Sequence, residues 1–576
     1  MKQATTLLTL LVDLLLVGCS GSRPATTSTS PDTTDTTTTS AQPASSETES
    51  SSTTEETESP DGSPPPAPTR APQDWYHLDR VPRSGPGLDT RAAYQTVLQD
   101  RAPKDTVRVA IIDSGIDIDH EDLTAETWTN ADEVPGNGVD DDDNGYVDDV
   151  HGWNFIGGPN GKDVNQDTYE LTRLYVDLRE RFGGMDSSEV APSDREAFQR
   201  YQDIKQAFQQ EKSEAQKQLA RVQKAETAVQ TSAQILKKHL ETDTLTAETV
   251  RSVSSPKRTV QRAQKTLRYF YNQGLSPEDL TDYKNQLEQR VEYNYNPDFN
   301  PRPIVGDDYA DKTERRYGNN DVEGPDPGHG THVAGVIGAT RENGIGINGI
   351  AKGVRLMSVR TVPNGDERDK DVANAIRYAV NNGADVINMS FGKSYSPHKD
   401  VVDAAVQHAD SMGVLMVHAA GNDGANVDST DNYPSPYYED GGRAERWIEV
   451  GASSWKGGKQ LAASFSNYGP ERVDVFAPGH AIYSTVPNDR YERNDGTSMA
   501  APMVSGLAAL MMAYYPSLTA TEVRSIILDT ATRYRDQAVT RPGGTGTARF
   551  GELSKTGAVV NAKSALQRAE DVARDE

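Results

Sequence analysis

The chain has few cysteines, basic residues and apolar residues for its length. Its 576 residues include one cysteine, Cys19, so no disulfide within the chain can stabilise the fold. Only 35% of the residues are apolar, which indicates that a good part of the chain lies outside any packed core. Lys and Arg number 59 against 86 for Asp and Glu, giving a net charge of -27. Because non-specific nucleic-acid binding needs a basic surface, no nucleic-acid partner is expected.

Residues 1–19 have the features of a bacterial export signal. Lys2 precedes an apolar stretch, 7–17, that is too short to span a membrane. The last four residues, Leu16-Val17-Gly18-Cys19, resemble the bacterial lipobox. This resemblance implies a lipid on Cys19 and an extracytoplasmic protein anchored to a bacterial membrane, with the outer membrane or the cell surface favoured. The alternative is a plain secretory signal that happens to contain a cysteine.

Composition divides the rest of the chain. Residues 20–72 consist almost entirely of Ser, Thr, Pro, Glu, Asp and Ala, and such a segment cannot bury enough apolar surface to offset its ordering entropy. We therefore expect a disordered tether there, a folded domain over 73–566 and a charged C-terminal tail over 567–576. No conventional folded pro-domain is expected before Trp75, and no further domain is expected after the folded one.

Apolar runs rich in β-branched residues alternate with helical patterns in the folded domain. The strands are expected at 107–113, 355–362, 385–390 and 414–419, and the helices at 372–381 and 401–412. Near-continuous apolar strands separated by helices are typical of a parallel sheet that is covered on both faces. The sequence therefore predicts an α/β fold of this kind, whose ligands bind beyond the carboxyl ends of the strands.

A long helical segment interrupts this pattern. Residues 189–241 are rich in Glu, Lys, Gln and Ala, with apolar residues three or four apart, and a second such stretch covers 260–293. Ser276 and Pro277 are a helix start within it, as N-cap and first-turn residue. We expect an inserted helical hairpin over 189–293, with coiled-coil character. A lid, a substrate-recruiting arm, a partner-binding arm and a passive decoration all fit the sequence equally.

Three short segments carry the residues of a nucleophilic site. They are Asp113-Ser-Gly, His329-Gly-Thr-His332 and Gly496-Thr-Ser498-Met-Ala. A serine hydroxyl attacks only when a neighbouring base takes its proton, and the base works best when a carboxylate fixes its tautomer. The chain order acid, imidazole, hydroxyl is one of the known orders for this geometry.

These segments, with Ala419-Ala-Gly-Asn422, are similar to the signatures of the subtilisin-like serine proteases, or subtilases, over about 73–162 and 297–566. The resemblance implies a serine endopeptidase that hydrolyses polypeptide substrates through an acyl-enzyme. It implies that Ser498 is the nucleophile, His329 the general base and Asp113 the residue that orients it. Asn422 would donate to the oxyanion, and His332 would be structural.

The resemblance also identifies a substrate-binding segment. Ser390-Phe391-Gly392 match the strand that pairs with the substrate main chain in this family. Lys393 stands where the family usually has a second glycine. We expect its side chain either at the rim of the specificity pocket, where it would favour acidic substrates, or in solvent.

Two groups of oxygen-bearing residues are candidate calcium ligands. Asp140, Asp142, Asn144 and Asp148 surround a turn glycine with the spacing of a calcium loop, although His151 occupies the position of the usual bidentate Glu. An acidic surface turn is the alternative. Separately, the family resemblance implies a second structural Ca²⁺ site with Asp122 and Asn343 as ligands.

Together these features predict a lipid-anchored, extracytoplasmic serine endopeptidase with structural Ca²⁺ and with the helical insertion as a candidate binding site for a protein partner. The alternative of a different class is a surface binding or adaptor lipoprotein, which would use an inactive protease fold and the helical arm. Intact Asp113, His329, Asn422 and Ser498 favour the enzyme, because a binding module needs none of them.

Overall fold

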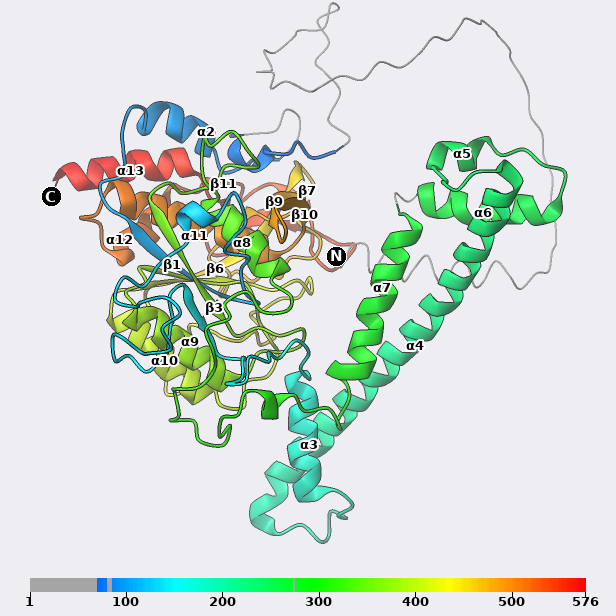
Figure 1. Cartoon of the computed structure of the whole chain (residues 1–576), viewed down its shortest axis with the longest axis horizontal. Coiled ribbons are helices and arrows are strands. Elements are labelled where there is room, and N and C mark those ends of the chain that lie inside the picture. Colours follow the sequence, from blue (N-terminus) through cyan, green and yellow to red (C-terminus); the bar gives the residue numbers. More distant parts are fainter. Residues whose placement is uncertain (1–69, 80–84, 273–274, 576) are drawn as a thin grey trace, which may run out of the picture.

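The computed structural model describes residues 70–79, 85–272 and 275–575 (Figure 1). The predicted export signal with Cys19, and the predicted tether up to residue 69, lie outside the described residues. The predictions made for them stay predictions.

A ten-stranded sheet runs through the described domain, in the order β11-β14-β8-β6-β5-β4-β1-β3-β2 with β7 paired to β6. The pairs from β8 to β2 are all parallel. The strands are β1 Val107–Asp113, β2 Gly152–Asn154, β3 Val354–Arg360, β4 Val386–Met389, β5 Leu415–Ala419, β6 Trp447–Gly457, β7 Gln460–Ala462, β8 Val475–Pro478, β11 Thr532–Arg533 and β14 Ala558–Val559. Two small hairpins pair β9 Ile482–Val486 with β10 Arg490–Asn494, and β12 Ala538–Thr540 with β13 Thr547–Arg549.

Helices cover both faces of this sheet, which confirms the predicted α/β fold (Figure 1). One face is covered by α8 Gly328–Gly338, α11 Thr497–Tyr514, α12 Ala520–Thr530 and α13 Ala562–Asp575, and the other by α9 Asp369–Asn381 and α10 Lys399–Ser411. Side chains of a strand alternate between faces. Accordingly, Val109 and Ile111 of β1 join the first core, and Ala110 and Ile112 join the second.

The central helix α11 is apolar on all sides. Within the described part of the chain it is the one helix long and apolar enough to cross a membrane, but 89% of that stretch is buried inside the fold. It is therefore a core helix, and its first turn reaches the edge of the sheet where the predicted nucleophile lies.

A helical arm projects from the α/β domain, as predicted (Figure 1). Its helices are α3 Glu170–Phe182, α4 Arg195–Leu240, α5 Ala247–Ser252, α6 Arg258–Asn272 and α7 Pro277–Gln289, followed by a π-helical turn, Arg290–Asn294. Helical structure thus begins at Glu170, before the predicted residue 189. The predicted start of α7 is confirmed, because Ser276 forms a capping box and Pro277 is the first helical residue.

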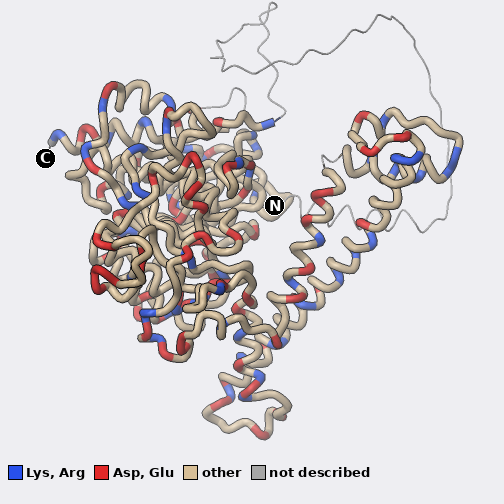
Figure 2. Tube along the Cα trace, in the orientation of Figure 1, with Lys and Arg blue, Asp and Glu red and all other residues tan. Residues whose placement is uncertain are grey.

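The arm contains two separate apolar clusters. The tip cluster joins the far parts of α4, α6 and α7 and includes Val222, Leu236, Leu267 and Leu287. The root cluster joins α3 to the first part of α4 through Leu171, Leu174, Ile204 and Phe208. Basic and acidic residues are interspersed along the helices between them (Figure 2). Each end of the arm therefore has its own core.

The predicted charged tail is, in its described part, the end of a packed helix. Residues 567–575 continue α13, and Ala569 is fully buried in the same core as α11. The recurrence of Ala and Val among charged residues in this segment reflects one buried face.

Candidate active site

Asp113 and His329 meet at the carboxyl end of the sheet. Asp113 is the last residue of β1 and is buried, and His329 lies in the first turn of α8. Oδ1 of Asp113 accepts hydrogen bonds from His329 Nδ1 at 2.7 Å and from the Ser114 amide at 2.8 Å. The other carboxylate oxygen is buried without a hydrogen-bond partner among the described residues. The negative charge of Asp113 is therefore left for the imidazole to balance.

Ser498 lies in the first turn of α11, beside the end of β4. The strand β4 pairs with β1, with Met389 opposite Ile112, so Ser390 follows one strand away from Asp113. Parallel neighbours are about 4.8 Å apart. The Ser498 hydroxyl donates to the Ser390 carbonyl at 3.0 Å, and the Ser390 hydroxyl donates to the Ser498 carbonyl at 2.9 Å.

Within the described residues, no hydrogen bond joins Ser498 to His329. Catalytic hydrogen bonds are often loose in enzymes without substrate. A rotation of χ1 moves the Ser498 hydroxyl without any change in the backbone.

A hydrogen-bonded chain holds this turn of α11 on β4. Ser505, two turns further along the helix, donates to Asn388 Oδ1 at 2.8 Å, and Asn388 donates to the Ser390 hydroxyl at 2.9 Å. All three side chains are buried. Since buried polar groups need partners, this chain fixes the helix in position relative to the strand.

Two hydrogen-bond donors near Ser498 remain free. Asn422 follows β5, and its Oδ1 accepts from the Thr497 amide at 2.8 Å and the Thr497 hydroxyl at 3.1 Å. Its Nδ2 has no partner within the described residues, and neither does the amide of Ser498, which lies in the first turn where helical amides are unpaired. Thr497 thus orients Asn422 so that an amide N–H and a backbone N–H are both available.

His332 has a different environment from His329. It is fully buried, and its Nε2 lies 3.1 Å from the Ile482 carbonyl and 3.3 Å from that of Glu492. Burial, together with the charge of the neighbouring His329, lowers the pKa of His332 to about 3. A neutral imidazole bonded to β9 and β10 has the properties of the structural role predicted for it.

The predicted substrate-binding segment, 390–392, follows β4 and has one edge with backbone groups that are unpaired within the described residues. The carbonyl of Phe391 accepts from His418, and the backbone of Lys393 pairs with that of Tyr433. Gly392 between them is exposed, and its N–H and C=O have no partner within the described residues. The segment therefore offers the backbone groups with which an added strand would pair.

Both predictions for the Lys393 side chain were wrong. It neither lines a pocket rim nor reaches solvent, because only 2% of it is exposed. Its Nζ contacts Glu170 Oε2 at 2.9 Å, Asp369 Oδ1 at 2.8 Å and the Glu367 carbonyl at 2.8 Å. The physical reason is the presence of the arm, since Glu170 is the first residue of α3.

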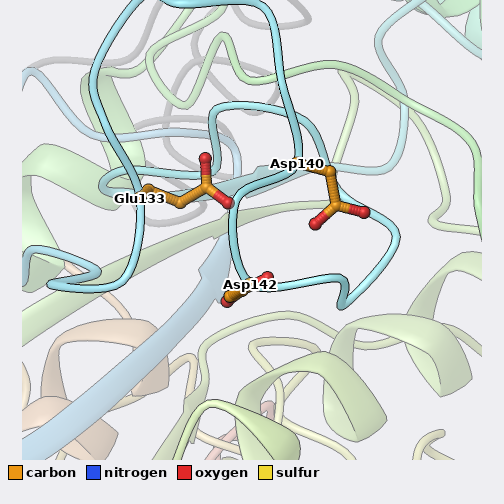
Figure 3. Close-up of side chains that lie close together, drawn as sticks. All are labelled: Glu133, Asp140 and Asp142. Atoms are coloured by element: carbon orange, nitrogen blue, oxygen red, sulfur yellow. The ribbon is translucent and has the colours of Figure 1, made fainter.

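The acidic loop brings together three carboxylates, two of them predicted. Oxygens of Glu133, Asp140 and Asp142 lie within 4.8 Å of one another, and the side chains point toward a common space (Figure 3). Asn144 and Asp148 lie outside this group. Asp148 accepts instead from the amides of residues 137 and 138, and Asn144 donates to Asp142 and to Asp149.

The chemistry of this group fits a hard cation. Glu133 is buried, and its Oε2 has no hydrogen-bond partner among the described residues. Burial raises the pKa of Glu133, and the charges of Asp142 and Asp141 add to this effect. The other oxygen of Glu133, Oε1, accepts from the Asp141 amide at 3.0 Å, and an unpaired buried oxygen beside two further carboxylates is an all-oxygen set of the kind that suits Ca²⁺. Sequence reasoning missed Glu133 because it precedes the acidic run, although an acidic residue just ahead of such a run was visible.

The second predicted pair of calcium ligands is also in contact. Asp122 is fully buried, its Oδ1 accepts from Asn343 Nδ2 at 2.7 Å, and its Oδ2 accepts from the Ile347 amide at 2.9 Å. Tyr491 donates to the same oxygen at 3.3 Å. A buried carboxylate with neutral partners and an adjacent amide side chain is a donor set that fits Ca²⁺.

Comparison with known proteins agrees with this geometry. Residues 104–546 match the model of the subtilase family. The chain is 38% identical over 276 residues to the thermophilic serine proteinase of Bacillus sp. (strain AK1), which covers 47% of this chain and 60% of that relative. It is 38% identical over 211 residues to subtilisin DY of Bacillus licheniformis, covering 36% of this chain and 72% of the relative.

A solved structure of a protease from Pseudoalteromonas arctica PAMC 21717 matches with 28% identity and a TM-score of 0.36, over 44% of this chain and 78% of the other. The family model covers well over half of the chain. The chain therefore belongs to the subtilase family.

Proposed function

We propose that this protein is a serine endopeptidase that cleaves polypeptides through an acyl-enzyme. The observation that carries this proposal is the 2.7 Å hydrogen bond between Asp113 and His329 at the sheet edge where Ser498 and two free donors lie. A binding module has no use for this combination. The family membership and the named relatives, both proteases, support the same activity.

The proposed mechanism gives a defined role to each of the four residues. Ser498 Oγ attacks the peptide carbonyl while His329 takes its proton at Nε2, since Nδ1 is bonded to Asp113. Asp113 stabilises the imidazolium that forms. The Asn422 amide and the Ser498 N–H donate to the oxyanion, helped by the positive end of α11. His329 then returns the proton to the leaving amine, and water hydrolyses the acyl-enzyme by the same steps.

A fluorophosphonate probe tests this proposal directly. Such a probe phosphonylates only a serine that a base has activated. We expect labelling of the wild type and of Ser525→Ala, an exposed serine on α12, and no labelling of Ser498→Ala. Failure of the folded wild type to react would favour the surface binding or adaptor lipoprotein instead.

We further infer that Ca²⁺ stabilises the protein. Glu133, Asp140 and Asp142 would hold one ion, which would fix the loop that follows Trp128. Asp122 and Asn343 would hold a second ion. The support is the unpaired buried oxygen of Glu133 and the all-oxygen character of both groups.

The location outside the cytoplasm, with Cys19 lipidated, is also a proposal, which rests on the sequence of residues 1–19. Membrane fractionation of wild type and Cys19→Ser tests it. We expect the wild type in the membrane fraction and the variant in the soluble fraction, and a soluble wild type would contradict the anchor.

A further inference from the structure

Two backbone segments flank the position that β1 leaves empty. The strand β1 ends at Asp113, while its neighbours β3 and β4 continue as the segments 361–367 and 390–393. We call these segments the two walls. Neighbouring strands lie about 4.8 Å apart, so β3 and β4, on either side of β1, lie about 10 Å apart, and this spacing fits one added strand between the two walls that follow them. The outer edges are occupied, because Asn364 pairs with Gln166 and Lys393 with Tyr433.

The root of the arm is bonded to the first wall at several points. The Glu170 amide donates to Asp366 Oδ2 at 2.8 Å. Arg173 donates to the carbonyls of Asp366 at 3.1 Å and Glu367 at 3.2 Å. From the other end of the arm, Asn294 donates to the Asn364 carbonyl at 2.9 Å. Both ends of the arm therefore meet on this wall.

Lys393 connects the same root to the second wall. Its Nζ bonds Glu170 Oε2 at 2.9 Å and the Glu367 carbonyl at 2.8 Å, so one ammonium group joins α3 and both walls. The side chains of Lys393 and Glu170 are 2% and 4% exposed. Tyr395, two residues further along, packs on the root cluster. Glu170 also pairs with Arg173 at 2.7 Å and Lys393 with Asp369 at 2.8 Å, and such a buried network of charges tolerates little displacement.

We propose that Glu170 and Lys393 are positioning residues that set the separation of the two walls, so that the root of the arm is part of the substrate-binding groove. This inference rests on the proposed peptidase function and deepens it. Neither residue touches the reacting atoms. They act on the backbone of 390–392 and 366–367, with which the main chain of an extended peptide would pair. Substrates that fill the groove depend on this pair, and reagents that reach only Ser498 do not.

The test compares short and long substrates in the full-length protein. Glu170→Gln, Lys393→Met and the double variant are assayed with two substrates. One is a tetrapeptide anilide, and the other is an ester of the N-acetylated last residue of that peptide. For each single variant we expect kcat/KM for the tetrapeptide to fall about 10–100-fold, mainly through KM. The ester and the rate of fluorophosphonate labelling stay unchanged. The double variant loses less than the sum of the singles, because both substitutions remove the same contact between the arm root and the second wall.

Arg181→Ala is the matched control, because it breaks the exposed ion pair between Arg181 and Asp194 at the far end of α3. It should hydrolyse both substrates as the wild type does. Equal losses on ester and tetrapeptide in Glu170→Gln, or no loss on either, would overturn the proposal.

A measurement that does not depend on catalytic activity tests the positioning role separately from the proposed peptidase function. Hydrogen exchange should quicken in the peptides that span 364–368 and 391–395 in Glu170→Gln, but not in Arg181→Ala. Unlabelled, inactive wild type with these exchange changes would refute the peptidase and keep the positioning role. Unchanged exchange in Glu170→Gln would refute the positioning role.

Discussion

Opposing effects act on the imidazole of His329. Burial lowers its pKa, but the charge and hydrogen bond of Asp113, with a further contribution from Asp326, outweigh burial and raise the pKa above its ordinary value. The protonated form is therefore favoured in the folded protein. This contribution to stability is fully present below the ordinary pKa of about 6.5 and is lost as pH rises through the raised value.

Activity should have the opposite pH dependence, because the general base must be neutral. We expect kcat/KM to rise with pH through the raised pKa of His329, with the midpoint of the acidic limb above pH 6.5. Asp113→Asn should move this limb to lower pH and reduce kcat about 10⁴-fold. A pH–rate profile of both proteins measures the two effects. An acidic limb at the same pH in Asp113→Asn would contradict the assignment.

Asn422 should matter for the rate and little for binding. Its free Nδ2 donates where negative charge develops, so Asn422→Ala should lower kcat about 10²–10³-fold and leave KM nearly unchanged. Steady-state kinetics with one peptide checks this. Asn382→Ala, at the end of α9, is a control of the same chemistry away from the site. A loss that appears only in KM would remove Asn422 from the oxyanion site.

At the scale of elements, strand ends and helix starts bring the site together. Asp113 ends β1, Ser390 follows β4 and Asn422 follows β5, three neighbouring strands, while His329 and Ser498 lie in the first turns of α8 and α11. These elements were predictable, because apolar runs and Gly-flanked motifs mark them in the sequence. The pairing of Ser505 with Asn388 was not predictable, since it depends on how α11 lies across the sheet.

Calcium bound by Glu133, Asp140 and Asp142 should stabilise the acidic loop as a whole. With Ca²⁺ present, Glu133→Gln should melt below the wild type by about 5 °C, if the ion is well above its dissociation constant. In EDTA the two melting temperatures should become equal or change order, because the variant lacks the buried charge of Glu133, whose Oε2 has no hydrogen-bond partner among the described residues.

Thermal melts in Ca²⁺, Mg²⁺ and EDTA measure this. Asp143→Asn, an exposed aspartate in the same loop, should behave as the wild type does. A wild-type melting temperature that EDTA leaves unchanged would contradict both calcium sites.

At the scale of the whole molecule, the arm consists of a root and a tip with different connections. The root cluster contacts the α/β domain through Tyr395, whereas the tip cluster contains residues of the arm alone. Between them, Gln223 of α4 bonds Glu288 of α7, which marks a place where the two long helices lie side by side. The tip is thus a separable part.

Removal of the tip should therefore leave the peptidase intact. We expect a variant that lacks residues 224–287, with Gln223 joined to Glu288 by a short Gly/Ser linker, to keep the wild-type kcat/KM for small peptides and its melting temperature. Cleavage of folded protein substrates then reports whether the tip recruits them. Loss of small-peptide cleavage in this variant would show that the tip, and not the root, supports the groove.

The order of amino acids was enough to predict the parallel α/β fold, the residues brought to the carboxyl edge of the sheet and the presence of a helical arm. Strand pattern and motif identity are local properties that a sequence carries directly. Three features could be seen only in the folded structure. They are the buried position of Lys393, the grouping of Glu133 with Asp140 and Asp142, and the contacts between the root of the arm and the two walls. Each of these depends on which distant charges come within about 3–5 Å in a buried site, and there Coulombic pairing decides whether a side chain is held inside or reaches water.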